Sequence, residues 1–361
     1  MRIIADFYYD ELPGGVQTLM KNFKDRLGFR PISFKKACYA MGIGRKDPLT
    51  LRFPEFEMGI IIHHYVKILE KYVGVDVLVY NSICSGFVNH NCKTVTIIND
   101  NNLEGPRRLF ETKFYSMFDY NVYRYLYFMI QKDSMKRSDA IVAPTEYLAN
   151  FYRKETKKEI EVIHHGIDTN IFYEMDKLKC RKKLGLPEDK IIGIYVGWFH
   201  PIKGFHIVSR LANEYRDVFW LIILKENVNY FEKLDNVRVV YNVRYEDMPY
   251  YYNASNFLIN PSMIETFGLT NIEAMACNVP VISSWEGIFR DKYEECKGIM
   301  PTGFGFLVEK HDYNLYREAL DEMIYYLKNG GYYFKPESYI DFWDLDIQTW
   351  QSKWESLLNY L

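Results

Sequence analysis

The sequence predicts an α/β protein with two Rossmann-like, doubly wound parallel-sheet domains. Short runs of apolar and β-branched residues alternate with segments of helical spacing, and this alternation occurs in two successive series. The chain of 361 residues is long enough for two packed cores. We expect an N-terminal domain over residues 1–168, a C-terminal domain over 169–338, and a helical segment over 339–361 that packs back toward the first domain.

The first series begins with a strand at the N-terminus. The break Pro13-Gly14-Gly15 follows, and residues 16–27 have helical spacing. The strands of this series are predicted at residues 2–7, 75–80, 93–98, 140–144 and 161–165.

The second series follows a polar, lysine-rich stretch. Its strands are predicted at residues 191–197, 218–224, 237–241, 257–260 and 280–283. Helices are predicted at residues 204–215 and 270–277. The last segment, 339–361, carries three of the six tryptophans on an amphipathic pattern, which favours packing against the body of the protein. In open sheets of this kind, ligands bind at the carboxyl ends of the strands, and two such domains would face a cleft.

Composition excludes several classes of protein. A net charge of −2 argues against a dedicated nucleic-acid binder. No stretch is long and apolar enough to cross a bilayer, and no signal peptide fits the opening residues MRIIADFYYD. The six cysteines form no CxxC pair and no metal-like spacing, so we expect reduced thiols, no metal site and a cytoplasmic protein.

One segment is strongly basic. Residues 20–46 carry eight Lys or Arg side chains and one acidic side chain, with four aromatic residues interleaved. This pattern fits a solvated face whose aromatic side chains belong to the core. It also fits a surface for anionic lipid headgroups or a phosphorylated acceptor, which would place the protein peripherally at the inner membrane face.

The strongest motif is PSMIETFGLTNIEAMA at residues 261–276, which follows an apolar strand and opens a helix. Glu265 precedes the helix and Glu273 lies inside it. Eight residues of helix rise about 12 Å, a span that suits two ends of one extended ligand. The backbone N–H groups of Phe267, Gly268 and Leu269 are expected to be unpaired at the helix start, where negative charge or sugar hydroxyls bind well.

This motif resembles the Glu-x7-Glu segment of the retaining glycosyltransferases of family 4, which have the GT-B fold. Other segments resemble that family in the same order along the chain. They are Gly14-Gly15, SDAIVAPTE at 138–146, VIHHGIDTNIF at 162–172, VGWFHPIKG at 196–204, and GFLV at 305–308 with Asp312.

The resemblance implies roles for individual residues. Glu265 would hold the donor sugar, Glu273 the ribose hydroxyls and Lys203 the diphosphate. The N–H groups of Gly14 and Gly15 would lie near the diphosphate and sugar, and Gly197 would be a further donor-binding residue. A lysine and a helix N-terminus placed there would stabilise the charge that develops on the leaving group.

Two departures from the family pattern stand at the expected site. The family usually has Arg directly after Gly197, where this chain has Trp198; Arg244, Arg107 or Arg108 could supply the missing cation. The family strand matching residues 93–98 often ends in His, where this chain has Asn99-Asp100. Asn cannot shuttle a proton at neutral pH, so Asp100 is a candidate base.

The resemblance therefore implies a retaining, metal-independent transferase that uses no cofactor and takes a UDP- or GDP-sugar as donor. Its acceptor would be a carbohydrate, a glycolipid or other lipid-linked carbohydrate, or a protein glycan. The alternative is a degenerate GT-B protein that binds a sugar nucleotide or glycan without turnover, as Trp198 and Asn99 suggest.

Overall fold

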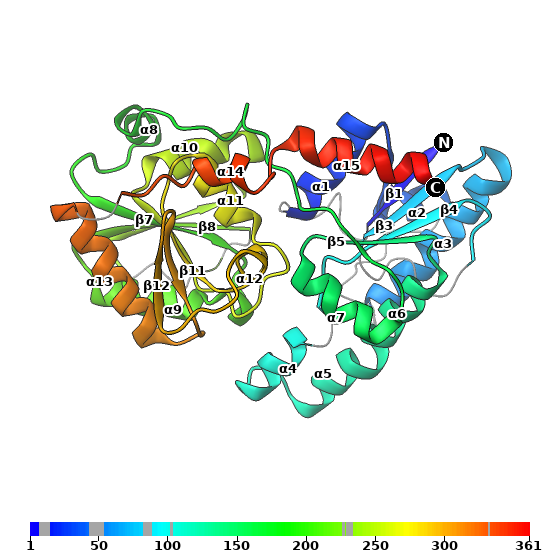
Figure 1. Ribbon diagram of the computed structural model, residues 1–361, viewed down its shortest axis with the longest axis horizontal. Coiled ribbons are helices and arrows are strands. Elements are labelled where there is room, and N and C mark those ends of the chain that lie inside the picture. Colours follow the sequence, from blue (N-terminus) through cyan, green and yellow to red (C-terminus); the bar gives the residue numbers. More distant parts are fainter. Residues whose placement is uncertain are drawn as a thin grey trace. The chain divides into compact units, whose positions relative to one another are not determined.

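The computed structural model describes residues 1–6, 15–42, 54–81, 89–101, 104–225, 228, 234–330 and 333–361. The described residues form two compact units (Figure 1). Residues 1–164 together with 351–361 form unit 1, and residues 165–350 form unit 2. Each unit is an α/β body built on its own sheet.

Unit 1 contains a six-stranded, wholly parallel sheet in the order β2-β1-β3-β4-β5-β6. Its strands are β1 (Arg2–Ala5), β2 (Arg30–Ile32), β3 (Val77–Asn81), β4 (Lys93–Ile97), β5 (Ala140–Ala143) and β6 (Glu161–Val162). The predicted strands of this half are present, and β2, a three-residue edge strand, was not predicted from the sequence.

Helices pack against this sheet around separate apolar clusters. One cluster joins β1 and β3 to α2 and α3, and another joins β5 to α6 and α7. The C-terminal part of α15 also belongs to unit 1, where the buried Trp354 ring lies edge-on to Phe23 at 4.7 Å. The helical segments are α1 (Gly15–Leu27), α2 (Phe34–Ala40), α3 (Pro54–Tyr72), α4 (Glu104–Glu111), α5 (Met117–Val122), a π-helical turn (Tyr123–Tyr127), α6 (Phe128–Arg137), α7 (Glu146–Thr156) and α15 (Ile347–Tyr360).

Most aromatic residues of the basic segment serve the core of unit 1. Phe23, Phe29 and Phe34 are buried, whereas Tyr39 on α2 is 89% exposed. Lys35 and Lys36 are exposed on the same short helix. The described part of this segment therefore combines core aromatics with a solvated basic face. Within the described ranges, no helix has both the length and the hydropathy of a membrane span.

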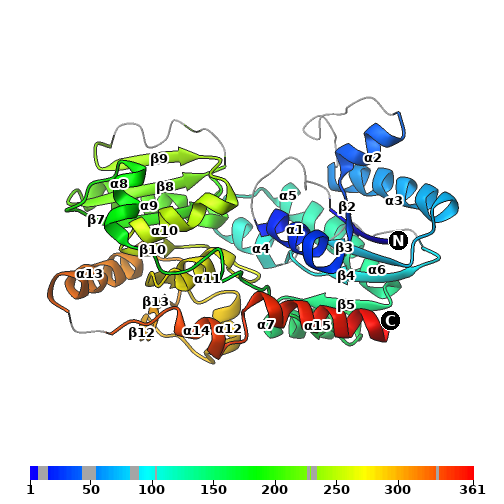
Figure 2. The same cartoon turned by 90° about the horizontal axis from the view of Figure 1, so that it is seen from above.

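Unit 2 contains a seven-stranded sheet in the order β12-β13-β11-β10-β7-β8-β9, which Figure 2 shows from one edge to the other. Every neighbouring pair is parallel except β12 and β13. The strands are β7 (Ile191–Gly197), β8 (Val218–Leu224), β9 (Val237–Tyr241), β10 (Phe257–Asn260), β11 (Val281–Ser284), β12 (Ile299–Thr302) and β13 (Gly305–Val308).

Alternate residues of these strands enter two separate cores. The cluster on one face includes Ile194 and Leu258 and is covered by α8, α10 and α11. The cluster on the other face includes Tyr195 and Phe257 and is covered by α9 and α13 (Figure 1). The helices are α8 (Lys177–Leu184), α9 (Phe205–Glu214), α10 (Met248–Ala254), α11 (Leu269–Ala276), α12 (Ile288–Lys292), α13 (Tyr313–Asn329) and α14 (Ser338–Phe342). The doubly wound architecture predicted from the sequence is thereby confirmed.

The unit boundaries differ from the predicted domains 1–168, 169–338 and 339–361. Residues 165–168 and 339–350 both belong to unit 2. Within unit 2, Ile167 N donates to Leu345 O at 2.8 Å and Ile167 forms a β-bridge with Asp346. The predicted helical segment 339–361 contains most of α14 and all of α15, and its share of unit 1 begins at residue 351.

Candidate functional site

The strand order of unit 2 creates a topological switch point. The chain passes from β7 to β8 on one side and returns to β10 on the other side of β7. Ligands of open α/β sheets bind outside the carboxyl ends of the strands at such a point. Lys203 follows β7 in a 3-10 turn (Pro201–Lys203), and Glu265 follows β10. Two residues distant in sequence are thus brought to the same sheet edge.

The two side chains form an ion pair at this edge. Lys203 Nζ lies 2.7 Å from Glu265 Oε1, and Ser262 Oγ lies 2.7 Å from the same oxygen. The Glu265 side chain is 13% exposed and that of Lys203 is 30% exposed. The two loops are also joined through the backbone, because Met263 N donates to Ile202 O at 2.7 Å. The structure therefore holds both predicted groups together before any ligand is considered.

Gly204 allows this close approach, and Gly197 leaves room for the Tyr195 hydroxyl. Gly204 has φ +71°, and a Cβ there would lie 2.1 Å from Pro261 O. A Cβ on Gly197 would lie 2.8 Å from the hydroxyl of Tyr195, which is within hydrogen-bond distance of the Trp198 and Lys203 carbonyls. Burial and Glu265 raise the pKa of Tyr195, so the phenol remains a hydrogen-bond donor.

A network of buried polar side chains reaches Glu265 through Ser262. Ser262 Oγ is 2.7 Å from Asn260 Oδ1, Asn260 Nδ2 donates to Asn271 Oδ1, and Asn271 Nδ2 donates to Ser283 Oγ. These four side chains are at most 4% exposed. They connect the ends of β10 and β11 with α11. Sequence reasoning missed them, although a polar residue at the end of an apolar strand was a usable signal.

The start of α11 follows the predicted arrangement in part. Gly268 has φ +93°, and the structure assigns no hydrogen-bond acceptor among the described residues to the N–H groups of Gly268 and Leu269. The Phe267 ring is buried and lies edge-on to His165 at 5.0 Å, and its carbonyl accepts from Ile288 N at 3.0 Å. Any contact of Phe267 with a ligand would therefore come from its backbone rather than its ring.

Glu273 lies on the buried face of α11. Tyr252 OH on α10 donates to Glu273 Oε2 at 2.7 Å, and Glu273 is 7% exposed. Burial raises the pKa of Glu273 to about 7, against a smaller lowering by the tyrosine hydrogen bond. The structure records no contact between Glu273 and the described Lys203–Glu265 pair. Glu273 is thus a carboxyl group poised to change charge near neutral pH.

Unit 1 has a switch point of its own between β1 and β3. Asp6 directly follows β1, Asn81 ends β3, and Asn99 follows β4. Asn81 Nδ2 donates to Asp6 Oδ2 at 2.6 Å, and Asn99 Nδ2 donates to Asn81 Oδ1. Asp6 and Asn81 are buried. Neither was predicted as a site residue, although each stands at the carboxyl end of a predicted strand.

The remaining predicted site residues of unit 1 are Asp100, Gly14 and Gly15. The Asp100 residue is exposed, and its backbone carbonyl accepts from Gln131 Nε2 at 3.0 Å and from Tyr152 OH at 3.2 Å. Gly15 is exposed at the first position of α1, and Gly14 lies outside the described residues. The roles of Asp100, Gly14 and Gly15 stay predictions.

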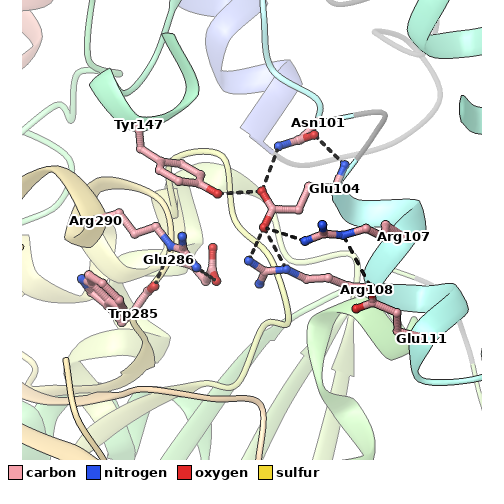
Figure 3. Close-up of polar contacts among 9 residues, drawn as sticks. All are labelled: Asn101, Glu104, Arg107, Arg108, Glu111, Tyr147, Trp285, Glu286 and Arg290. Atoms are coloured by element: carbon pink, nitrogen blue, oxygen red, sulfur yellow. Dashed lines mark hydrogen bonds and ion pairs between the residues drawn. The ribbon is translucent and has the colours of Figure 1, made fainter. Parts of the chain in front are cut away.

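The arginines considered as substitutes for a missing cation have acidic partners. Glu104 accepts from Tyr147 OH at 2.6 Å and from Arg108 Nη2 at 2.5 Å. Arg107 lies between Glu104 and Glu111, as Figure 3 shows. Within unit 2, Arg244 is exposed and pairs with Asp247 at 2.8 Å.

A second acid–arginine pair belongs to unit 2 and is drawn in the same figure. Arg290 Nη2 lies 2.8 Å from the buried Glu286 carboxylate, and Arg290 Nε donates to Trp285 O (Figure 3). The preceding strand is β11, so this pair also follows the carboxyl end of a strand.

A cavity of about 650 Å³ lies elsewhere, in unit 1. It is lined by residues at the amino-terminal ends of β4 and β5, including Lys93 and Asp139, together with His90 and Arg137. It contains none of the predicted site residues. The sheet topology and the ion pair favour the carboxyl edge over this cavity as the reactive site. In the described ranges, no three His, Cys, Asp or Glu side chains are grouped as metal ligands would be.

Two family models match successive parts of the chain. The family model described as Glycosyltransferase Family 4 matches residues 36–171, and that described as Glycosyl transferases group 1 matches residues 176–326. D-inositol 3-phosphate glycosyltransferase 1 of Catenulispora acidiphila is 27% identical over 188 residues, covering 46% of this chain and 44% of the relative. The enzyme of Acidothermus cellulolyticus is 26% identical over 219 residues, covering 54% and 47%. The matches span about half the length of these curated relatives.

Solved structures resemble the whole chain. Sucrose-phosphate synthase from Thermosynechococcus elongatus has a TM-score of 0.81 at 18% identity, covering 100% of this chain and 99% of that one. Anabaena HepE in complex with UDP and glucose has a TM-score of 0.71 at 16% identity, with 100% and 99% covered. These likenesses and the two parallel-sheet units define a GT-B fold. The two family models then place the chain among the group 1 glycosyltransferases of the family 4 type.

Proposed function

We propose that this protein is a retaining glycosyltransferase that moves a sugar from a nucleotide-diphosphate sugar to a carbohydrate, glycolipid or protein-glycan acceptor. The observation that carries the proposal is the Lys203–Glu265 ion pair at the switch point of unit 2, directly before the α11 N-terminus. A cation and open backbone N–H groups suit a diphosphate, and a carboxylate suits sugar hydroxyls.

The proposed roles follow from the chemistry of each group. Lys203 and the N–H groups of Gly268 and Leu269 stabilise the diphosphate as the glycosidic C–O bond breaks and its electron pair moves to the phosphate oxygen. Glu265 accepts hydrogen bonds from the donor sugar, and Glu273 accepts them from the ribose. The acceptor oxygen bonds to the anomeric carbon on the face that the phosphate leaves. Its proton passes to the departing phosphate oxygen or to Asp100, so no charge or atom is left unassigned.

The donor class is part of the proposal. UDP and UDP-glucose complexes are known for Anabaena HepE, which shares the fold. We propose a UDP- or GDP-sugar as donor, with no resident metal and no cofactor. Activity that persists in excess EDTA supports this chemistry, and activity restored only by added Mg²⁺ or Mn²⁺ contradicts it.

The decisive experiment is incubation with a panel of nucleotide sugars. The proposal predicts slow donor hydrolysis with one of them and loss of about a hundredfold or more in Glu265→Gln, because the sugar loses a charged acceptor. Arg244→Ala, which breaks an exposed ion pair in the same unit, is the matched control and should retain activity. Nucleotide binding without turnover, unchanged in Glu265→Ala, would instead support the alternative, a degenerate GT-B protein that binds a sugar nucleotide or glycan without turnover.

Stereochemistry is tested on the same reaction. A retaining transferase gives product with the donor's anomeric configuration, read from the anomeric proton coupling in NMR. An inverted product would contradict the retaining mechanism but not the transferase activity itself.

A peripheral membrane contact through residues 20–46 is proposed in a narrower form, because the aromatic residues Phe23, Phe29 and Phe34 are buried. The exposed Lys35, Lys36 and Tyr39 of α2 would carry it. Co-sedimentation with anionic vesicles should fall with added salt and in Lys35→Gln/Lys36→Gln. Equal recovery in the supernatant with neutral and anionic vesicles rejects it.

A further inference from the structure

The Glu265 carboxylate is held by only one of its two oxygens. Lys203 Nζ and Ser262 Oγ both lie 2.7 Å from Glu265 Oε1. Among the described residues, Glu265 Oε2 takes part in no hydrogen bond or ion pair. The Glu265 side chain is 13% exposed. The protein therefore anchors one carboxylate oxygen and leaves the other for a ligand.

The direction of the buried amide network is fixed at its far end. Ser283 Oγ donates to the Ser284 carbonyl at 3.2 Å, and a backbone carbonyl can only accept. The Ser283 oxygen therefore accepts from Asn271 Nδ2 at 3.1 Å, and Asn271 Oδ1 accepts from Asn260 Nδ2 at 3.2 Å. With its amide nitrogen engaged in this way, Asn260 presents its Oδ1 atom to Ser262.

The Ser262 hydroxyl consequently lies between two acceptors. Its oxygen is 2.7 Å from Asn260 Oδ1 and 2.7 Å from Glu265 Oε1. A hydroxyl group has a single proton, so it donates fully to only one of them at a time. Ser262 is 1% exposed, so bulk solvent does not compete for that proton. The proton thus has two positions, one on a neutral amide oxygen and one on a carboxylate oxygen, which is the stronger acceptor.

The balance between these positions depends on Lys203. In the structure its ammonium group gives Glu265 Oε1 a charged donor. The proposed function gives this ammonium group a second task, because it also binds the diphosphate. A phosphate that draws the ammonium group toward itself weakens the Lys203–Glu265 contact. Among the described residues, Ser262 is then the donor that remains for Oε1.

We propose that Ser262 is a positioning residue for Glu265. When a nucleoside diphosphate engages Lys203, the Ser262 proton turns from Asn260 to Glu265 Oε1 and keeps the carboxylate in place. Glu265 Oε2 then accepts a hydrogen bond from a hydroxyl group of the donor sugar. Only the Ser262 hydroxyl rotates, and no covalent bond is made or broken. This assignment rests on the proposed function, because it concerns the same donor site.

The test separates the sugar from the rest of the donor. Dissociation constants of the nucleoside diphosphate and of the nucleotide sugar are measured by calorimetry for uridine and guanosine ligands. Ser262→Ala should weaken binding of the nucleotide sugar about tenfold. It should change binding of the nucleoside diphosphate less than about threefold, because water solvates the open carboxylate when no sugar is bound. Equal losses for the two ligands contradict the proposal.

Ser255 provides a matched control in the same unit. Its side chain is fully buried, and its hydroxyl donates to the Tyr251 carbonyl at 2.9 Å. Ser255→Ala therefore removes a buried serine hydroxyl that does not contact Glu265. It should leave the ratio of the two dissociation constants unchanged. An equal change of this ratio in Ser255→Ala and Ser262→Ala would overturn the proposal.

A double-mutant cycle tests whether Ser262 acts through Glu265. In the Glu265→Gln background, Ser262→Ala should weaken binding of the nucleotide sugar less than about twofold, because the carboxylate that it positions is gone. A tenfold loss that persists in this background contradicts the assignment.

Conservative variants at position 262 complete the test. Ser262→Thr keeps the hydroxyl and should retain the wild-type affinity for the nucleotide sugar within about threefold. If Ser262→Ala does not fold, Ser262→Cys replaces it, because a thiol is only a weak donor and the same loss is expected. Wild-type affinity in a folded Ser262→Ala or Ser262→Cys variant would overturn the proposal.

The outcomes separate the two proposals. If the wild type binds none of the nucleotide sugars, the proposed function fails. If it binds one of them and Glu265→Gln weakens that binding while Ser262→Ala does not, only the inference about Ser262 fails.

Discussion

The two units present the same topological feature with different chemistry. In unit 1 the switch point between β1 and β3 carries Asp6 and Asn81, joined by a hydrogen bond of 2.6 Å and continued to Asn99. In unit 2 the switch point between β7 and β10 carries Lys203 and Glu265. One network consists of a carboxylate and two amides, and the other contains a cation. A shared switch point therefore indicates where a site lies but not which ligand it suits.

The loops at the two edges differ as well. In unit 2 the site loops touch, since Gly204 lies against the Pro261 carbonyl and Gly287 against the Phe267 carbonyl. The contact at Gly204 holds the loops of Lys203 and Glu265 together, as the proposed stabilisation of a leaving group would require. The contrast is consistent with the proposal that an anionic donor binds at unit 2, where the cation lies.

The largest effect on stability is expected from adding a side chain at Gly204. Gly204→Ala combines a left-handed backbone with a Cβ 2.1 Å from Pro261 O. Strain and overlap together should destabilise unit 2 by about 3 kcal/mol or more, which lowers its melting temperature by roughly 10 °C.

Gly28 is the matched control in unit 1. It has φ +69° with nothing within 4 Å of a Cβ, so Gly28→Ala adds backbone strain of about 1 kcal/mol without overlap. Thermal unfolding of Gly204→Ala and Gly28→Ala separates the effect of atomic overlap from that of backbone strain. Equal shifts would show that the loops of unit 2 are not held by close contact.

A smaller effect, which depends on pH, is expected at Glu273. Its pKa is raised from 4.5 to about 7 in the folded protein, so the folded state binds the proton more tightly than the unfolded chain. The contribution is fully present below about pH 4.5 and is lost as pH rises through about 7. By linkage the loss amounts to at most about 3 kcal/mol. Glu273→Gln should remove this part of the pH dependence, measured by urea unfolding at pH 5 and pH 8.

One result of the urea unfolding would contradict the titration of Glu273. If the wild type and Glu273→Gln lose stability in parallel over this range, then Glu273 does not titrate there. A nucleotide that binds the charged carboxylate through its ribose would bind the wild type more tightly above pH 7, and Glu273→Gln would remove that trend.

The smallest effect is expected from the polar chain of unit 1. Asn81→Ala removes the donor to the buried Asp6 carboxylate and should destabilise unit 1 by about 1–3 kcal/mol. The matched substitution Asn170→Ala alters a side chain that is exposed in unit 2 and should shift stability by less than about 0.5 kcal/mol. The unfolding midpoints of Asn81→Ala and Asn170→Ala test this prediction. Similar midpoints would contradict a stabilising role for the Asp6–Asn81 contact.

The sequence was sufficient for the fold and for the pair at the centre of the site. Periodicity located most strands of both sheets but not β2, β12 or β13. The Glu-x7-Glu motif with the lysine after Gly197 singled out Glu265 and Lys203. What it could not supply were contacts that depend on strand order. Asp6 meets Asn81 because β1 lies beside β3, and Asn99 meets Asn81 because β4 lies beside β3. The sequence also did not show that the Ile167 backbone pairs with that of Leu345 within unit 2.

The central claim is that the donor nucleotide binds at the switch point of unit 2. Its most direct test is the dissociation constant of the nucleoside diphosphate, measured by calorimetry for the wild type, Lys203→Ala and Asn81→Ala. The account predicts a loss of about tenfold or more for Lys203→Ala and a change of less than about threefold for Asn81→Ala. Equal losses, or a larger loss for Asn81→Ala, would contradict it.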